Sequence, residues 1–310
     1  MAMEIIYVPL FALGLVILLK GADIITDYSS RIARALGVSE IVIGITLVSF
    51  ATSLPELAVV VTSAFGGVSS IATGTIVGSN IANIGLVFAL AALFSDFFVK
   101  SAYLKQASIM LSFSFLVSAF FIDGFFWFEG VVLIILSILY IFWLVKLYNG
   151  TEPAKKPTET HKRLVLYAFL CLFGGIAVIL GANFVVTSAV GMAQLFGVSE
   201  TMISLIIIAI GTSLPELVTS VVAARKKLRG ISLGNIIGSN IFNITILSIS
   251  SLIAVVPATT KILFINIPIM LLLALLLLVF IKTRPMVSKV EGMIFLMIYA
   301  VFVTLQFVGI

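Results

Sequence analysis

Residues 52–57 read Thr-Ser-Leu-Pro-Glu-Leu, and residues 212–217 repeat the same six amino acids. Residues 78–81 read Gly-Ser-Asn-Ile, and this motif recurs at 238–241. Both pairs are offset by 160 residues, and self-similarity at a fixed offset is the sign of an internal repeat. The sequence therefore predicts that the chain consists of two homologous halves.

The amino-acid composition predicts that lipid surrounds most of the chain. Of its 310 residues, 62% are hydrophobic and 10% are charged, whereas soluble domains contain roughly 45–50% apolar and about 25% charged residues. So few charges cannot cover a water-exposed surface. The single cysteine, Cys171, excludes a disulfide framework, and the single histidine, His161, excludes most zinc sites and histidine-based catalytic sites.

Ten apolar stretches are long enough to cross a bilayer, which takes about 20 helical residues. Helix is expected because an isolated strand would leave its backbone groups unpaired in lipid. The predicted fold is an all-α integral membrane protein with ten transmembrane helices, at residues 5–26, 41–64, 71–94, 104–122, 128–147, 164–188, 201–224, 231–255, 262–281 and 291–309.

The distribution of basic residues predicts the orientation of these spans. If both termini lie outside, 16 of the 18 Lys and Arg residues fall in loops on the inner side, as the positive-inside rule requires. We therefore expect a multi-pass protein of the cell membrane with both termini outside. The compact chain favours a prokaryotic membrane.

The number of spans in each half predicts how the halves are related. Each half holds five spans, an odd number, so the second half is inverted relative to the first. We expect a first repeat at 1–147, a cytoplasmic linker at 148–163 and a second repeat at 164–310. Inverted repeats are typical of secondary transporters, whose binding site lies near the midplane. A passive channel built from repeats remains an alternative.

Glu56 and Glu216 are the most costly residues in the predicted spans, because each lies near the middle of its helix. A carboxylate at that depth must face a partner or a water-filled path. The spans around residues 41–94 and 201–255 contain no basic residue at similar depth. Two buried anions without a built-in cation indicate that the cation is the ligand. The alternative is that both carboxyl groups are protonated and structural.

A proline precedes each of these glutamates. Pro55 and Pro215 lack the N–H that would bond the carbonyl four residues earlier, and broken backbone at membrane depth is tolerated where it lines a cavity. The carbonyls freed in this way lie beside the hydroxyl groups of Thr52, Ser53, Thr212 and Ser213. Carboxylate, carbonyl and hydroxyl oxygens are hard ligands that suit Ca²⁺ or Na⁺.

The second repeated motif supplies further polar groups. Ser79 and Asn83 lie four residues apart and share one helix face, as do Ser239 and Asn243. We interpret these pairs as ligands, with hydrogen bonding between helices as the alternative. Asn80 and Asn240 point about 100° away and are expected to brace the kinked helices.

One polar pair is expected outside this centre. Lys20 and Asp23 lie three residues apart on one helical face and should form a local ion pair.

The doubled Thr-Ser-Leu-Pro-Glu and Gly-Ser-Asn-Ile-x-Asn motifs resemble the calcium/cation antiporter superfamily, most closely its prokaryotic sodium/calcium exchanger branch. The resemblance covers the whole chain. It implies a Na⁺/Ca²⁺ antiporter with ten helices, in which spans 2, 3, 7 and 8 form the ion-binding centre and spans 1 and 6 slide past them. Exchange of H⁺, or of another divalent cation, is the alternative within transport.

The resemblance also implies roles for single residues. Glu56 and Glu216 would bind Ca²⁺ together with the backbone carbonyls of Thr52 and Thr212. Na⁺ would use overlapping positions, namely Ser53, Ser79, Ser213, Ser239 and the backbone at Ser49 and Ala209. Many members of the superfamily carry an aspartate at the position of Asn83 or Asn243, whereas this chain has asparagine at both. The centre then holds two formal negative charges, which leaves the exchange stoichiometry open.

The remaining expectations concern binding partners, oligomeric state, cofactors and catalysis. Ca²⁺, Na⁺ and the lipid bilayer are its expected partners. We expect a functional monomer that is not an enzyme, needs no cofactor and does not bind nucleic acid. An intramembrane hydrolase, the alternative from another class, would need a nucleophile with its base, an aspartate pair or ligating histidines. The sole histidine, His161, lies in a predicted loop, and the paired glutamate motifs fit ion ligation better.

Overall fold

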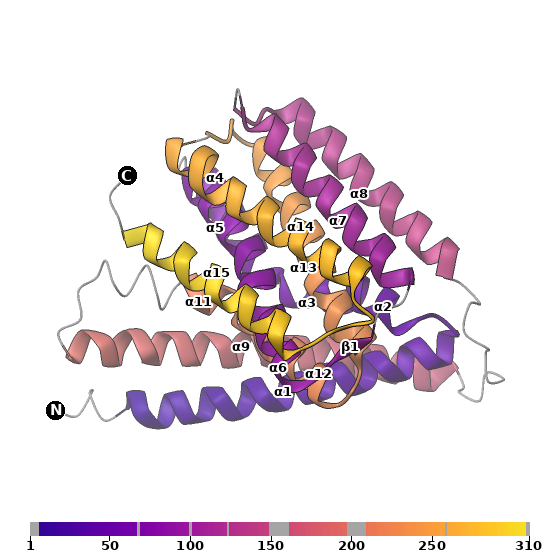
Figure 1. Cartoon of the computed structure of the whole chain (residues 1–310). Helices are drawn as coiled ribbons and strands as arrows, with labels where there is room; N and C mark the ends of the chain where they lie inside the picture. The colour runs from indigo at the N-terminus through magenta and orange to yellow at the C-terminus, as the bar shows by residue number, and fades with distance from the viewer. Residues whose placement is uncertain are drawn as a thin grey trace.

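The computed structural model of the protein describes residues 6–66, 69–98, 101–122, 124–148, 161–196, 209–257 and 259–307 (Figure 1). Nearly all of its elements are helices. In the first half these are α1 (Tyr7–Leu36), α2 (Glu40–Ile43), η1 (Gly44–Val48), α3 (Ser49–Thr52), α4 (Leu54–Phe65), α5 (Ser69–Ala82), η2 (Asn83–Phe88), α6 (Ala89–Phe94), α7 (Ser101–Phe120) and α8 (Trp127–Tyr148), where η denotes a π-helical segment.

Seven helical elements are described in the second half. They are α9 (His161–Leu195), α11 (Ala209–Thr212), α12 (Leu214–Arg225), α13 (Arg229–Ser251), η4 (Ile262–Asn266), α14 (Ile267–Thr283) and α15 (Lys289–Phe307). Two short strands, β1 (Phe97–Phe98) and β2 (Met286–Val287), pair antiparallel and join the end of α6 to the start of α15. The chain is therefore an all-α protein in its described parts apart from this small ladder.

Eight of the described helices are long and apolar enough to cross a membrane. The bent pair formed by residues 40–52 and 54–65 adds a ninth candidate. Large apolar side chains on the outer helices face outward, among them Ile138, Phe142 and Phe169, as expected where acyl chains replace water. These features establish a multi-pass membrane protein. Of the predicted spans, 201–224 can be compared only from residue 209 onward, and the other nine fall on helices.

Two helices are longer than the sequence predicts. α1 continues ten residues past the predicted end at 26, and α9 extends beyond 164–188 at both ends. The apolar criterion stops at the polar residues of α1, yet the helix buries them: Thr26 donates to the Ala22 carbonyl at 2.8 Å, and Ser29 lies 3.1 Å from Cys171 Sγ. α1 ends where Gly37 adopts a left-handed conformation with φ of 65°, which glycine adopts without strain.

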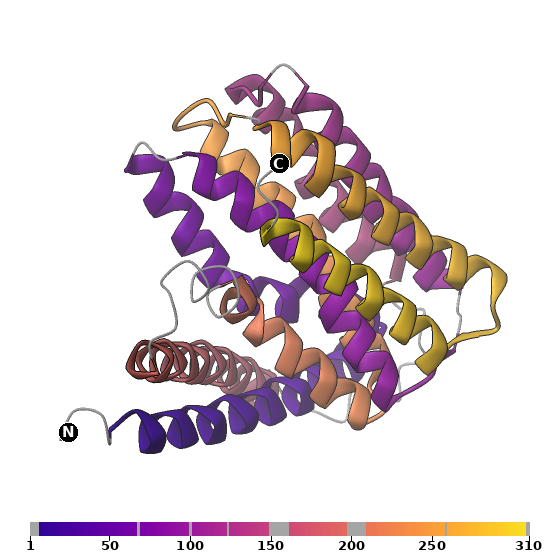
Figure 2. The same ribbon diagram turned by 60° about the vertical axis from the view of Figure 1, so that its left-hand side comes forward.

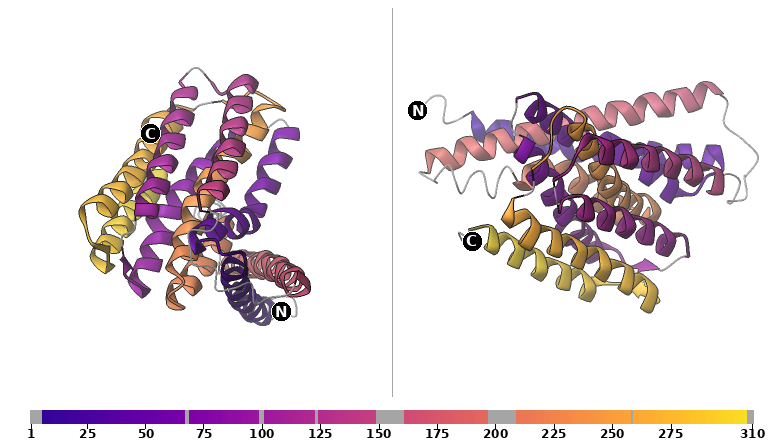
Figure 3. Two further views of the ribbon diagram at one scale, coloured as in Figure 1. Left: turned by 90° about the vertical axis from the view of Figure 1, so that its right-hand side faces the viewer. Right: turned by 90° about the horizontal axis from the view of Figure 1, so that it is seen from above.

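α1 and α9 lie side by side and cross the other helices at a steep angle (Figures 1 and 2). Glycines on both helices bring their backbones together. A Cβ atom at Gly21 would lie 2.8 Å from the Val178 nitrogen, and one at Gly181 would lie 2.5 Å from the Leu18 nitrogen. Small residues allow such close packing in membranes. The pair therefore forms a layer of its own against the remaining bundle, as the end-on view in Figure 3 shows.

α13 occupies the centre of that bundle and is buried along most of its length. It packs against the segment formed by α2, η1 and α3, and glycines again set the distance. A Cβ atom at Gly44 would lie 2.8 Å from the Ile231 carbonyl oxygen, and one at Gly234 would lie 2.7 Å from that of Ile41. This contact joins the helix that carries the first Thr-Ser-Leu-Pro-Glu motif to the helix that carries the second Gly-Ser-Asn-Ile motif.

We predict that Gly174→Ala separates α1 from α9, because its new methyl group would lie 2.9 Å from the Ile25 backbone nitrogen. The free energy of unfolding should fall by about 1–3 kcal/mol, the usual cost of overpacking. Gly175→Ala is the matched control, since its methyl would meet the Ala51 Cβ at 3.3 Å, a side-chain atom and not the backbone. Thermal unfolding in detergent measures both variants, and equal midpoint temperatures would contradict the prediction.

Candidate functional site

The two Thr-Ser-Leu-Pro-Glu motifs form helix breaks with almost the same geometry. Ser53 separates α3 from α4 with φ and ψ of −85° and 8°, and Ser213 separates α11 from α12 with −89° and 7°. The first break bends its helix by 49°. The prolines explain the breaks, because neither can donate to the preceding turn. Each break also starts a new helix whose first turn contains the glutamate.

Starting a helix beside each glutamate has an electrostatic consequence. Glu56 lies in the first turn of α4, and Glu216 lies in the first turn of α12. The N-terminus of a helix carries partial positive charge and unpaired N–H groups, so it stabilises a carboxylate. The kinked backbone thus supplies part of the charge compensation that the basic side chains do not.

Both carboxylates are buried, with 1% of each residue exposed. No basic side chain in the described ranges forms an ion pair with either. Ser53 donates to Glu216 Oε1 at 3.0 Å, and Ser79 lies 3.5 Å from Glu56 Oε1. Burial of two like charges without a cation is strongly unfavourable. The structure buries both glutamates and places Ser53 of the first half beside Glu216 of the second, and their joint binding of one cation stays a prediction.

Hydroxyl groups from both halves surround the carboxylates. Ser53 Oγ lies 3.2 Å from Ser239 Oγ as well as near Glu216, so the first break contacts α13 directly. Ser213 Oγ is buried at the second break and has no partner among the described residues. Ser53 and Ser239 therefore lie at one centre with Glu216, and Ser79 lies beside Glu56.

Ser49, Thr52, Ala209 and Thr212 are the positions predicted to bind ions through their backbone. The Ser49 carbonyl accepts from the Ser53 N–H at 3.0 Å and from Thr52 Oγ1 at 3.3 Å, and the Ser49 hydroxyl donates to the carbonyl of Ile45. Thr212 ends α11 directly before the second break, and Ala209 begins α11. The structure gives no side-chain surroundings for Ala209.

The four asparagines at positions 80, 83, 240 and 243 differ in their hydrogen bonds. Asn80 donates to the Asn240 carbonyl at 3.3 Å and accepts from Asn243 Nδ2 at 3.0 Å, while Asn240 donates to the Ile236 carbonyl. Asn80 thus joins α5 to α13, whereas the Asn240 side chain bonds the backbone of its own helix, and none of these bonds reaches the proline-kinked helices. By contrast, both amide atoms of Asn83 and Oδ1 of Asn243 have no partner in the described structure.

Most of the buried polar atoms that lack a hydrogen-bond partner in the described structure belong to the predicted site residues. Among the described residues, seven buried side-chain nitrogen and oxygen atoms lack a hydrogen-bond partner. Six of them belong to predicted site residues: Oε2 of Glu56, Oε2 of Glu216, Oγ of Ser213, Nδ2 and Oδ1 of Asn83, and Oδ1 of Asn243. Buried polar atoms are almost always paired in folded proteins. Their concentration around two carboxylates indicates a site for a ligand that binds oxygen.

The donor set defines the kind of ligand. It consists of two carboxylates with neutral hydroxyl, amide and carbonyl oxygens, which are ligands for hard cations. No group of three or more His, Cys, Asp or Glu side chains that could hold a metal ion occurs in the described ranges. The arrangement therefore fits Ca²⁺ or Na⁺ and offers nothing to a soft transition metal.

Sequence reasoning missed the residues that extend this centre along α12 and α13. Thr52 Oγ1 donates to Asn235 Oδ1 at 3.1 Å, and Asn235 Nδ2 donates to Ser220 Oγ at 3.0 Å. Thr219 Oγ1 is the seventh unpaired buried atom. The comparison of the two halves could not find these residues, because the first half has different amino acids there. Helical spacing from Glu216 and Ser239 would have found them.

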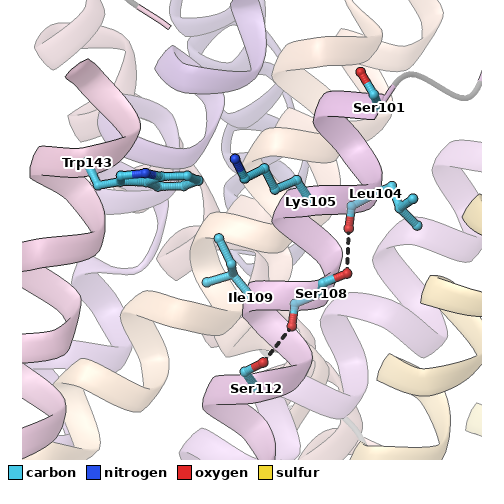
Figure 4. Close-up of a pocket in the computed structure, with 7 residues that line it drawn as sticks. All are labelled: Ser101, Leu104, Lys105, Ser108, Ile109, Ser112 and Trp143. Carbon is cyan, nitrogen blue, oxygen red and sulfur yellow. Dashed lines mark hydrogen bonds between the residues drawn. The ribbon is translucent and has the colours of Figure 1, made fainter. Parts of the chain in front are cut away.

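A pocket of about 380 Å³ between α7 and α8 lies apart from this centre. Figure 4 shows Lys105 extending toward the indole of Trp143, with its amino group 4.5 Å from the ring centre. The other residues that line the pocket are Ser101, Leu104, Ser108, Ile109 and Ser112. A lysine and no carboxylate make this pocket unsuitable for a cation.

The helical fold and the acidic, oxygen-rich centre define a membrane protein that handles hard metal cations. The chain belongs to the sodium/calcium exchanger family, because the family model described as sodium/calcium exchanger protein matches residues 6–146 and 166–308.

Individual relatives agree with this assignment. The chain is 34% identical to sodium/calcium exchanger MaX1 of Methanosarcina acetivorans, covering 95% of this chain and 97% of that protein. It is 36% identical to an uncharacterized membrane protein of Methanocaldococcus jannaschii, covering 96% and 97%. A solved structure of the sodium-calcium exchanger NCX_Mj, soaked with Na⁺, superposes with a TM-score of 0.88 at 35% identity, covering 97% and 99% of the two chains. The family is one of exchangers and not of enzymes.

We predict that Asn80→Ala lowers the free energy of unfolding by about 1–3 kcal/mol, because it leaves the buried Asn243 amide unpaired. Asn83→Ala is the matched control, since it removes an equally buried side chain whose amide has no partner among the described residues, and its loss should be clearly smaller. Thermal unfolding in detergent with a chelator and without Na⁺ compares them. An equal loss for both variants would contradict the contribution of Asn80 to the contact between α5 and α13.

Proposed function

We propose that the protein is a secondary active antiporter that exchanges Na⁺ for Ca²⁺ across the cell membrane by alternating access. The observation that carries this proposal is the concentration of unpaired buried oxygens around Glu56 and Glu216. Its similarity to MaX1 and to NCX_Mj over nearly the whole chain supports the same exchange reaction. Na⁺ and Ca²⁺ are then its substrates, and the protein needs no resident cofactor.

The finer organisation is ten transmembrane helices arranged as two inverted five-helix repeats. The first repeat spans residues 1–147 and the second 164–310, and residues 148–163 form a cytoplasmic linker. The constant offset between the repeated motifs and the matching breaks at Ser53 and Ser213 support this arrangement. The basic loops favour both termini on the outside. The chain functions as a monomer.

The proposed ion-binding site, called the cage from here on, combines charged and neutral oxygens from both repeats. Glu56 and Glu216 bind Ca²⁺ with the carbonyls of Thr52 and Thr212, and their two charges neutralise one Ca²⁺ ion. Na⁺ ions use overlapping oxygens from Ser53, Ser79, Ser213 and Ser239 and the backbone at Ser49 and Ala209. Asn83 and Asn243 contribute amide oxygens without adding charge. The shared position of Glu216, Ser53 and Ser239 within hydrogen-bonding distance supports this overlap.

Occupancy of the cage controls the conformational change. An empty cage holds two bare carboxylates, and the loss of their hydration in an occluded state is costly. A bound cation removes that cost, so only the occupied protein moves between its two open states. The α1 and α9 pair, held together by glycine contacts and set apart from the bundle, slides as one unit. A Na⁺ gradient then drives Ca²⁺ out of the cell.

Exchange of Ca²⁺ for H⁺, or transport of another divalent cation, is the second candidate, because buried carboxyl groups can also carry protons. Proteoliposomes distinguish the coupling ions directly. Uptake of radioactive calcium should follow an imposed Na⁺ gradient and should be absent when only a pH gradient is imposed. Uptake driven by the pH gradient without Na⁺ would favour the proton-coupled alternative.

We predict that Glu56→Gln, which keeps the shape and removes the charge, lowers Na⁺-dependent calcium flux at least tenfold, and that Glu216→Gln does the same. The loss of one charge-assisted ligand in a buried site has this size. Glu129→Gln is the control, because Glu129 Oε2 only accepts from the Phe126 N–H near the start of α8 and a glutamine oxygen can replace it. Unchanged flux in Glu56→Gln would refute the cage.

A further inference from the structure

The centre is extended on one side by a column of buried polar side chains, defined here as Thr219, Ser220, Ser232 and Asn235. Each of the four is fully buried. Thr219 and Ser220 follow Glu216 by three and four residues and therefore share its face of α12. Asn235 and Ser232 precede Ser239 by four and seven residues on α13, so they continue the face on which Ser239 lies.

Hydrogen bonds connect the two faces of this polar column. Asn235 Nδ2 donates to Ser220 Oγ at 3.0 Å, and Ser232 Oγ donates to the Ser220 carbonyl at 2.9 Å. Asn235 Oδ1 accepts from Thr52 Oγ1, which joins the column to the cage. The rise of a helix places Ser220 about 6 Å beyond Glu216 toward the turn between α12 and α13. The polar column therefore leads from the cage toward one membrane face.

The first half of the chain has only one polar residue at the four positions equivalent to the polar column. The residues 160 positions earlier are Val59, Val60, Ala72 and Thr75. The cage motifs themselves are the same in both halves, so the difference begins directly beyond the cage. Hydrogen bonding between α12 and α13 alone does not account for Thr219, whose buried hydroxyl has no partner among the described residues.

The membrane face reached by the polar column carries two carboxylates on α1 and the basic residues Arg225, Lys226, Lys227 and Arg229 around the α12–α13 turn. Lys226 Nζ pairs with Asp23 Oδ1 at 3.0 Å and with Asp27 Oδ1 at 2.9 Å, so two carboxylates share one ammonium group. The predicted pairing of Asp23 with Lys20 was wrong, because Lys226 at the end of α12 reaches Asp23 across the interface with α1. Arg225 lies over the ring of Phe94 instead.

We propose that the polar column is the route by which cations pass between the cage and the membrane face at the α12–α13 turn. Its hydroxyl and amide oxygens replace part of the hydration shell of a moving Na⁺ or Ca²⁺ ion. Because these oxygens are neutral, they bind the ion more weakly than the carboxylates do. This inference rests on the proposed exchange function and adds that the two sides of the cage differ in polarity.

The experiment replaces hydroxyls by methyl groups of the same shape in the full-length protein. We expect Thr219→Val/Ser220→Val, which introduces the residues of the first half, to lower Na⁺-driven calcium flux in proteoliposomes about tenfold. This is the effect expected when oxygens that stabilise a charge are lost. Equilibrium calcium binding to the purified protein should stay within twofold of the wild type, which also reports that the variant is folded.

Two further variants serve as controls. The first is Thr219→Ser/Ser220→Val, which keeps the hydroxyl at position 219 and should restore flux relative to Thr219→Val/Ser220→Val. Thr62→Val/Ser63→Val removes a consecutive threonine and serine from α4, where Ser63 bonds only the Val60 carbonyl, and its flux should stay within twofold of the wild type.

The outcomes separate this inference from the proposed function. Unchanged flux in Thr219→Val/Ser220→Val would overturn the route, and loss of calcium binding together with flux would place the two residues in the cage instead. Absence of Na⁺-driven flux in the wild-type protein would overturn the proposed function, and the route with it. Reduced flux with intact calcium binding is the result that supports the route.

Discussion

Two buried carboxylates without a basic partner in the interior of a membrane protein are the constraint on which the structure depends. Glu56 and Glu216 are each 1% exposed, and neither forms an ion pair with a described basic residue. Such an arrangement is unfavourable in a medium of low polarity unless a cation or protons compensate it. The surrounding helices are organised to reduce that cost without removing it, so the centre stays dependent on its ligand.

The compensation comes chiefly from backbone and neutral side chains. Each proline break places a helix N-terminus beside a carboxylate, and serine and threonine hydroxyls supply hydrogen bonds. A lysine or arginine at the same place would neutralise the site permanently and would compete with a metal ion. Partial charges and hydroxyls stabilise the carboxylates more weakly, which leaves room for a cation to add stability when it binds. The α13 contacts at Gly44 and Gly234 then fix the distance between the two halves of the site.

Much of this arrangement could be predicted from the sequence because it depends on repetition. The identical motifs at 52–57 and 212–217 identify the glutamates, the breaks and the neighbouring hydroxyls, and nine predicted spans fall on helices. The length of α1 could not be predicted, because its last turns are polar by composition and buried only through packing on other helices. Asn235 and Thr219 were missed for the opposite reason. They lie beside the site but break the repeat, so a search for repeated residues passes over them.

The same distinction between repeated and unrepeated residues has a mechanistic meaning. An exchanger must present one set of ligands to both sides of the membrane in turn, so selection for the cage acts on both repeats alike and keeps their motifs equal. The route from the cage to each face serves one side only, and nothing in that requirement keeps the two routes equal. The replacement of two valines in the first half by Thr219 and Ser220 in the second is the kind of difference this allows. The two halves therefore share their motifs around Glu56 and Glu216 and differ directly beyond them, and the proposed route would lower the cost of dehydration on one side alone.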